Sequence, residues 1–215
     1  MHRLHPASEF VKLFPSEEIP RIIQNILQGC KTLKREIPAE LENQLTSRLF
    51  RKLISFPDYR IGPLTVVPQW ESSIINFSKD EAQIKGRADI LFIFPGGGLE
   101  TYFLVEAKRL FVTSKNGKIS SLTGKYIDDG MMRFAVGQYA SKMTSGAMLG
   151  YVFDKHIDDA IIALSAAINK KSKSLNIIEN GEWQKSSLPV SPQVNETRHE
   201  FSQGKFTIYH ILTQV

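Results

Sequence analysis

Charged residues occur inside two apolar segments of the chain, where buried strands do not normally carry charge. The stretch 86–110, GRADILFIFPGGGLETYFLVEAKRL, contains Asp89 in its first apolar run and Glu106 and Lys108 in its second. Long apolar runs on both sides of these residues indicate strands that are buried on two faces. Charges in such strands are costly unless they are paired or bound to a metal. The stretch therefore predicts a chemical site.

A glycine-rich turn at 95–100 joins the two runs, so we predict antiparallel strands over 87–94 and 101–107. If the turn is symmetric about its central glycines, Phe94 faces Thr101 and Asp89 faces Glu106. Cβ atoms of residues paired across two strands are about 5 Å apart. This register brings the two carboxylates together.

The groups around this point suit hydrolysis of a phosphodiester. Glu106 and Lys108 share a strand face because side chains alternate along a strand, and the carbonyl of Ala107 lies between them. Two adjacent carboxylates repel unless a cation bridges them. A hard ion with oxygen ligands resolves this conflict, so we expect Mg²⁺, with Mn²⁺ as a substitute. Lys108 would orient or deprotonate a water, or stabilise the transition state.

A third carboxylate comes from the helix expected over 38–55, PAELENQLTSRLFRKLIS. On a helical wheel, Leu41, Leu45, Leu49 and Leu53 form one apolar stripe. Glu42 falls inside this stripe and Glu40 outside it. A helix that packs its leucines on the sheet would therefore point Glu42 towards the sheet. The alternative for Glu42 is a half-exposed side chain favoured by the helix dipole.

The remaining elements predict an α/β fold with a mixed central sheet and flanking helices. We expect one domain over 1–215, with a core at about 38–153, a helical extension over 1–37, and a C-terminal helix with strands over 154–215. Further expected elements are helices at 16–30, 128–144 and 156–170, β-rich pieces in 64–77, a strand at 147–153, short strands near 174–178 and 205–212 with a polar loop between them, and a basic loop at 113–125.

The order αβββαβ and the carboxylates within it resemble the PD-(D/E)XK nuclease superfamily, which has the restriction-endonuclease-like fold. The resemblance covers about 38–153 and places Glu42 on the first helix, Asp89 on a strand, and Glu106-Ala107-Lys108 on the next strand. Ala88 stands where the motif has proline. The resemblance implies that Glu42, Asp89, Glu106 and the Ala107 carbonyl hold Mg²⁺, and that Lys108 positions or activates the water.

Substrate contacts are expected from residues near this motif. Arg133 and Gln138, in the helix predicted over 128–144, are candidates for phosphate contact, and Arg109 is a third. Tyr139 is assigned to the core. Lys115, Lys118 and Lys125 in the basic loop have two interpretations, contact with a nucleic-acid backbone or solvated loop lysines.

Composition sets broad limits on the function. The formal charge of +5 and pI of about 9.2 fit a polyanionic partner, but many proteins without one are as basic. A single cysteine, Cys30, excludes an intrachain disulfide and a multi-cysteine zinc site. His156, His199 and His210 lack metal-ligand spacing. Neither a signal peptide nor a membrane span is evident, so we expect a cytoplasmic protein.

We therefore predict a Mg²⁺-dependent nuclease that acts on nucleic acid, with DNA favoured, in a restriction or phage-defence setting. The main competing hypothesis is a non-catalytic nucleic-acid-binding or assembly subunit on the same fold. Two weaker hypotheses are a phosphodiesterase for small nucleotides and a domain whose charged residues form only a surface cluster. Whether the chain forms a homodimer or needs a partner protein stays open.

Overall fold

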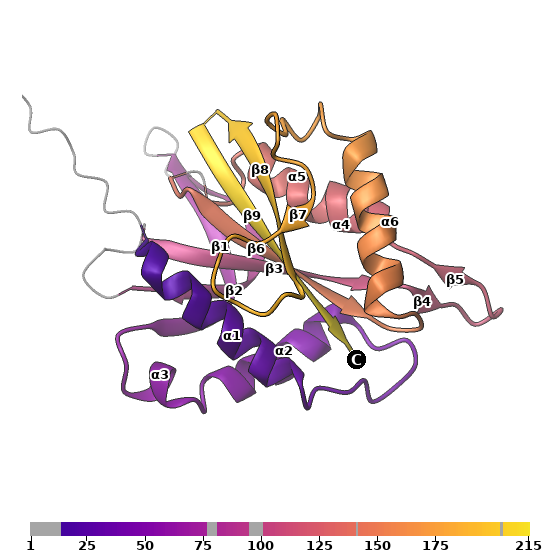
Figure 1. The fold of residues 1–215 in the computed structure, drawn as a ribbon. Coiled ribbons are helices and arrows are strands. Elements are labelled where there is room, and N and C mark those ends of the chain that lie inside the picture. Colours follow the sequence, from indigo (N-terminus) through magenta and orange to yellow (C-terminus); the bar gives the residue numbers. More distant parts are fainter. Residues whose placement is uncertain (1–13, 77–80, 95–100, 141, 203) are drawn as a thin grey trace, which may run out of the picture.

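A mixed seven-stranded sheet in the order β1-β2-β3-β6-β9-β8-β7 forms the centre of the molecule (Figure 1). The computed structural model describes residues 14–76, 81–94, 101–140, 142–202 and 204–215, with the side chains of 70–86 excepted. The turn expected at 95–100 lies outside the described residues. The α/β class and the mixed sheet flanked by helices are confirmed.

The sheet strands are β1 (Thr65–Asn76), β2 (Glu81–Ile93), β3 (Tyr102–Leu110), β6 (Ser145–Val152), β7 (Gln184–Lys185), β8 (Val194–Phe201) and β9 (Gly204–Gln214). A separate two-stranded ribbon consists of β4 (Val112–Thr113) and β5 (Ile119–Ser120). The helical elements are η1 (Ser16–Glu18), α1 (Ile19–Cys30), α2 (Glu42–Leu53), α3 (Pro57–Arg60), α4 (Thr123–Tyr126), η2 (Ile127–Met131), α5 (Met132–Ala135) and α6 (Ile157–Lys170). None of the helices in these described ranges is long and apolar enough to cross a membrane.

Strand directions divide the sheet into three parts. Strands β1, β2 and β3 are antiparallel, β3–β6 and β6–β9 are parallel, and β9–β8–β7 are again antiparallel. The helix α2, three strands, the α4–α5 segment and β6 follow one another along the chain in the predicted order. Strand β3, which carries Glu106 and Lys108, therefore lies between an antiparallel neighbour, β2, and a parallel neighbour, β6.

Alternation along β6 shows which helices cover which face. The hydroxyl of Tyr151 is 3.1 Å from that of Thr46 on α2, whereas a Cβ at Gly146 would lie 2.6 Å from the ring of Phe134 on α5. Residues of opposite parity in a strand point to opposite faces. Helix α2 therefore covers one face and the α4–α5 segment the other, and glycine at 146 lets Phe134 approach the sheet closely.

Buried leucines explain how α2 attaches to the sheet. Leu45, Leu49 and Leu53 are fully buried, as their spacing predicts. Leu41 departs from the expected stripe because α2 begins at Glu42, so that Leu41 is the N-cap residue and is 50% exposed. The helix is shorter at its start than the predicted 38–55.

The helix predicted over 128–144 is wrong in its extent. The chain forms α4, one π-helical turn (η2) and α5, which ends at Ala135. The cause is Gly137, whose φ of +67° places a left-handed residue just after the C-cap. The backbone N–H of Gly137 bonds to the carbonyl of Phe134, which closes the last turn and reverses the chain.

Two expectations for the C-terminal third are also wrong. The segment near 174–178 forms one isolated bridge, Ile177 with His199, instead of a strand. The segment expected to be a polar loop contains β8, which pairs with β9 along its whole length. The pattern of β8 is hard to recognise because its inward-facing positions are polar, including the fully buried Thr197 and His199.

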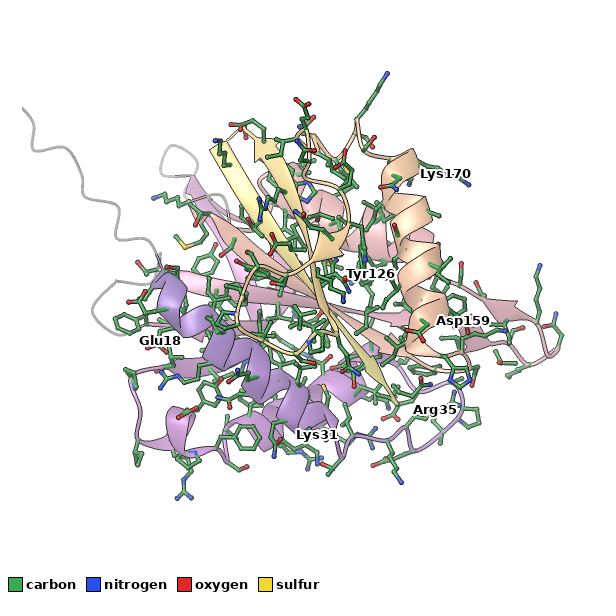
Figure 2. The ribbon with its side chains drawn as sticks, viewed as in Figure 1. Glu18, Lys31, Arg35, Tyr126, Asp159 and Lys170 are labelled. Atoms are coloured by element: carbon green, nitrogen blue, oxygen red, sulfur yellow. The ribbon has the colours of Figure 1, made fainter. Side chains whose placement is uncertain are left out.

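A neutral histidine network joins β8 and β9 to α4. It runs from the Tyr126 hydroxyl to His210 Nδ1 (2.9 Å), from His210 Nε2 to Thr197 Oγ1 (2.9 Å), from Thr197 Oγ1 to His199 Nε2 (2.7 Å), and from His199 Nδ1 to the Leu175 carbonyl (2.8 Å). Because a carbonyl accepts, His199 Nδ1 donates, and with both rings neutral one consistent set of donors satisfies every link. Figure 2 places Tyr126 deep in the molecule.

Candidate active site at a fork in the sheet

The two strands that carry the carboxylates pair in the predicted register. Paired residues run from Ile90 with Val105 to Ile93 with Tyr102, and the N–H of Phe94 is 3.5 Å from the Thr101 carbonyl. Continuing this register one step places Asp89 beside Glu106.

The pairing of β2 with β3 ends at Ile90 and Val105, and from there the two strands separate, which we call the fork. The part of β2 before Ile90 pairs only with β1, and the part of β3 after Val105 pairs only with β6. At the fork, Asp89 Oδ2 accepts the backbone N–H of Ala107 at 2.7 Å. A side-chain carboxylate thus takes the position that a neighbouring strand's carbonyl would hold, and it fixes Asp89 next to β3.

Glu106 and Lys108 form a buried pair on one face of β3. They are 1% and 6% exposed, and Lys108 Nζ lies 2.5 Å from Glu106 Oε1. The same ammonium donates to the carbonyl of Ala107 at 3.0 Å. Of the predicted group of two carboxylates, one lysine and one carbonyl, the Glu106 carboxylate, the lysine and the carbonyl are therefore in contact.

Glu42 reaches the same cluster from the first turn of α2. Its Oε1 is 3.8 Å from Lys108 Nζ, and its Oε2 accepts the backbone N–H of Arg109 at 3.3 Å. The side chain keeps 35% of its surface exposed. Glu42 therefore forms the solvent side of the cluster, whereas Glu106 forms its buried side.

Arg109 holds the start of α2 in place. Its Nη1 donates to the carbonyls of Glu40 at 3.0 Å and Ala39 at 3.4 Å. Glu40, placed off the leucine stripe by the helical wheel, is nevertheless 3% exposed, because it precedes the helix and its carboxylate pairs with Arg48 at 2.6 Å. These contacts fix where Glu42 enters the site, and contact of Arg109 with substrate stays a prediction.

Arg133 joins the cluster from α5. Its Nη1 lies 3.0 Å from Glu106 Oε1 and 2.5 Å from the hydroxyl of Tyr139. That hydroxyl also donates to the carbonyl of Arg87 on β2. Tyr139 is buried, as expected of a core residue, but it also clamps Arg133. Gln138 lies in the turn after α5, and its predicted role is untested.

The electrostatics of the site reflect two carboxylates in a poorly solvated place. Burial, reinforced by the charge of Asp89, raises the pKa of Glu106 to about 7, against the opposing effect of Lys108 and Arg133. Burial also raises the pKa of Asp89, although the Ala107 N–H acts in the opposite direction. The three carboxylates of Glu42, Asp89 and Glu106 face two cations. The cluster is therefore short of positive charge.

The donor set is compatible with a hard divalent cation. Glu106 Oε2 is buried and has no hydrogen-bond partner, and the Asp89 carboxylate and the Ala107 carbonyl provide further oxygens. Within the described ranges, no three His, Cys, Asp or Glu side chains form a ready metal group. The ammonium of Lys108 lies between Glu106 and Glu42, so this lysine partly neutralises both carboxylates in the metal-free protein.

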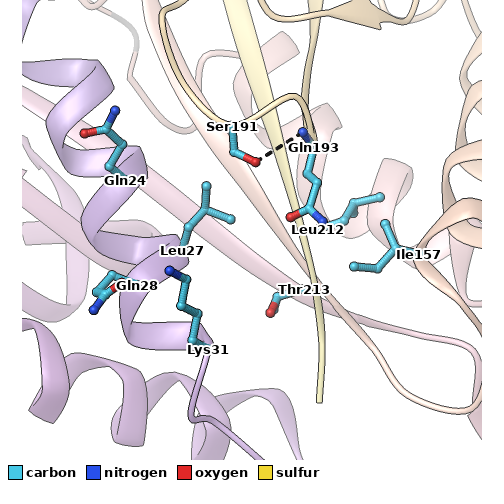
Figure 3. Close-up of a pocket in the computed structure, with 9 residues that line it drawn as sticks. All are labelled: Gln24, Leu27, Gln28, Lys31, Ile157, Ser191, Gln193, Leu212 and Thr213. Carbon is cyan, nitrogen blue, oxygen red and sulfur yellow. Dashed lines mark hydrogen bonds between the residues drawn. The ribbon is translucent and has the colours of Figure 1, made fainter.

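The surface has a groove beside α2 and a separate cavity beside α1. An open groove of about 800 Å³ follows the outer side of α2 and reaches Gln69. Gln69 lies between Pro68 and Trp70, which pair with the two neighbours of Asp89 in β2, Ile90 and Ala88. A second cavity, of about 360 Å³, lies between α1, the loop 191–193 and the end of β9 (Figure 3). Among the described residues that line this cavity, Lys31 alone is charged, and none belongs to the carboxylate cluster.

Comparison with known proteins leaves the geometry as the basis for assigning a function. No protein-family model, curated protein or solved structure matches this chain.

Proposed function

We propose that the protein is a Mg²⁺-dependent nuclease that hydrolyses phosphodiester bonds in nucleic acid, with DNA as the favoured substrate, and that its αβββαβ core is restriction-endonuclease-like. The observation that carries this proposal is the unsatisfied, buried Glu106 Oε2 beside Asp89 at the fork. Buried polar atoms normally have partners, and an unpaired carboxylate oxygen next to a second carboxylate suits a divalent cation, which relieves the repulsion between the two groups.

The residues divide into ligands and groups that act on substrate. Glu106, Asp89, Glu42 and the Ala107 carbonyl would hold Mg²⁺, which when bound polarises a phosphate and lowers the pKa of bound water. Lys108 holds Glu106 in place and offers an N–H to the attacking water or to the charge that develops on the phosphate. Arg133, which is 31% exposed at its side chain, supplies a guanidinium suited to a phosphate oxygen.

The direct test is cleavage of supercoiled plasmid and linear DNA with Mg²⁺, with Mn²⁺ and with chelator. Wild-type protein should cut with either metal and not with chelator. Asp89→Asn and Lys108→Ala should each lower the rate by at least about a hundredfold. The first change removes a proposed metal ligand, and the second removes a cation that stabilises the transition state.

Matched surface variants on α6, Asp158→Asn and Lys170→Ala, make the same chemical changes away from the cluster and should cut like the wild type. Cutting that persists in Asp89→Asn and Lys108→Ala would place the activity elsewhere. Absence of metal-dependent cutting on both DNA and RNA would refute the nuclease.

One observation favours the non-catalytic hypothesis, a nucleic-acid-binding or assembly subunit. Lys108 Nζ already lies between Glu106 and Glu42, so that part of the negative charge is neutralised by the protein itself. Isothermal titration with Mn²⁺ separates the two proposals. A nuclease should bind the ion through Asp89, with binding lost in Asp89→Asn, whereas a structural charge cluster should bind no ion in either protein.

A further inference from the structure

The ribbon β4–β5 leaves the body of the protein directly after the strand that carries the site. It follows Leu110, the last residue of β3, and projects beyond α6 in Figure 1. All residues from 114 to 120 are exposed. A two-stranded ribbon with no core of its own is marginally stable in water, so burial of apolar surface does not explain this one.

Contacts at the base of the ribbon set its direction. Phe111 and Leu122, which flank it, both have positive φ, +56° and +55°, a conformation that is unfavourable for bulky residues. The N–H of Phe111 bonds to the Ser121 carbonyl at 3.2 Å. Asp154 accepts the N–H of Thr113 at 2.7 Å, so the ribbon is tied to the end of β6.

The acid at the base of the ribbon is neutralised. Asp154 pairs with Arg35 at 2.6 Å, and although burial acts in the opposite direction, bonds from Arg35 and Thr113 hold the pKa of Asp154 below its usual value. The ribbon itself, residues 111–122, carries Lys115 and Lys118 and no acidic residue. It therefore presents a positive surface.

The tip of the ribbon is ordered by its own hydrogen bonds. Gly117, with φ of +79°, makes the turn, and Ser114 Oγ donates to the carbonyl of Lys118 at 2.8 Å. The turn places Lys115 and Lys118 on either side of Asn116-Gly117. Lys115 follows Lys108 by seven positions, a span of at most about 23 Å at 3.3 Å per residue, or about seven base pairs of duplex.

We propose that the β4–β5 ribbon binds the phosphate backbone of a nucleic-acid duplex beside the carboxylate cluster, with Lys115 and Lys118 as the contacting residues. This inference rests on the proposed function, because the cluster itself is short of positive charge and repels a phosphate backbone. Contacts outside the cluster must then supply the attraction that keeps the duplex in place. Such contacts carry no sequence preference.

The test is the salt dependence of binding. A short fluorescent DNA duplex is titrated with protein in chelator, so that no cutting occurs, over a series of salt concentrations. Removing two phosphate contacts should lower the steepness of log K against log salt by about 2. We expect this change in Lys115→Ala/Lys118→Ala, equally for two unrelated duplex sequences.

The matched control is Lys170→Ala/Lys173→Ala, which removes the same charge. These lysines lie at or just after the C-terminal end of α6, whereas Asp159 and the ribbon lie towards its other end (Figure 2). It should keep the wild-type slope. Equal slopes in the wild type and both double variants would overturn the ribbon contact, as would failure of the wild type to bind duplex at low salt.

The cleavage assay separates this result from failure of the proposed function. Cutting by the wild type with equal slopes in all three proteins would leave the nuclease and overturn the ribbon contact. Duplex binding with a slope that depends on Lys115 and Lys118, but without cutting under any metal, would support the ribbon contact and refute the nuclease.

Discussion

Two of the buried polar clusters in the protein differ in their charge and in how completely their groups are paired. In the histidine network of Tyr126, His210, Thr197, His199 and Leu175, each donor meets an acceptor and the side chains are neutral. In the carboxylate cluster around Glu106, several groups are charged and one buried oxygen has no partner. Fully satisfied networks rigidify a fold, whereas buried carboxylates with an unpaired oxygen are the arrangement expected of the cation site proposed above.

The difference has an energetic counterpart. The histidine network should contribute to stability as long as its rings stay neutral, because each buried group is paired. The carboxylate cluster should cost stability in the free protein, because like charges are held together in a place of low solvation. Variants in the two clusters should therefore change stability in opposite directions.

The largest expected effect is the loss of stability on acidification through the histidine network. Burial lowers the pKa of His199 to about 4 from its ordinary 6.5, and burial together with His199 lowers that of His210. As pH falls below 6.5, the unfolded chain takes up protons that the folded protein does not bind. For His199, this should lower the stability by about 3 kcal/mol by the time the pH reaches its folded-state pKa of about 4, and His210 should add a loss of the same sign.

Urea unfolding at several pH values measures this loss, which should be absent above pH 6.5. His156→Asn, at an exposed position, should behave like the wild type, and His199→Asn should lose less stability on acidification. Protonation of Glu106, whose pKa is raised to about 7, stabilises the folded protein over the same pH range, so the deciding quantity is the difference between His199→Asn and the wild type. Equal pH dependence in these two proteins would show that the network tolerates charge.

The next effect is removal of the central hydroxyl of the network. Thr197→Val keeps the shape of the side chain but leaves His199 Nε2 and His210 Nε2 without their shared partner, which should cost about 2 kcal/mol. Denaturant unfolding gives the value, and nuclease activity per folded molecule should not change. An unchanged stability would mean that the hydroxyl is dispensable and that the comparison between the clusters fails.

A smaller effect is expected from Tyr139→Phe, which tests whether the Tyr139 hydroxyl positions Arg133 or whether the residue only packs in the core. Tyr139→Phe keeps the ring against Phe134, whose centroid is 5.9 Å away, but releases Arg133. We expect about a tenfold loss of kcat, as for groups that orient a catalytic residue, with a stability change of at most about 1 kcal/mol. Adding Arg133→Lys should then cause little further loss, whereas additive losses would argue against a shared role.

The smallest effect should have the opposite sign to that of Thr197→Val. Asp89→Asn retains an oxygen for the Ala107 N–H and removes one of the repelling charges, so the metal-free protein should become more stable by about 1 kcal/mol. Thermal unfolding in chelator measures this gain. A loss of stability would mean that Asp89 serves the fold rather than a ligand.

The parts of the site that could be predicted from the sequence depend on strictly local periodicities. Alternation along two strands, with a register symmetric about the segment that joins them, was enough to place Asp89 beside Glu106. The leucine spacing of α2 was enough to direct Glu42 towards the sheet, even though Leu41 itself proved exposed. In both cases one repeating geometry determines the direction of a side chain, whatever the rest of the chain does.

The parts that could not be predicted depend on breaks in those periodicities. Glu40 is buried because it precedes α2, where a helical wheel does not apply. Tyr139 reaches Arg133 because Gly137 reverses the chain, which places residues six apart next to one another. Glycine after a candidate helix was the available signal. Strand β8 escaped prediction because Thr197 and His199 are polar residues that face inward.

The position of β9 has a consequence for how the protein folds. Strand β3 is completed on one side by β6, and β6 in turn by β9, although more than fifty residues separate Val152 from Gly204 along the chain. Pairings between distant segments form slowly. Until β9 docks, β6 presents an open apolar edge of the kind that drives aggregation, so synthesis of this protein should depend strongly on temperature and on chaperones.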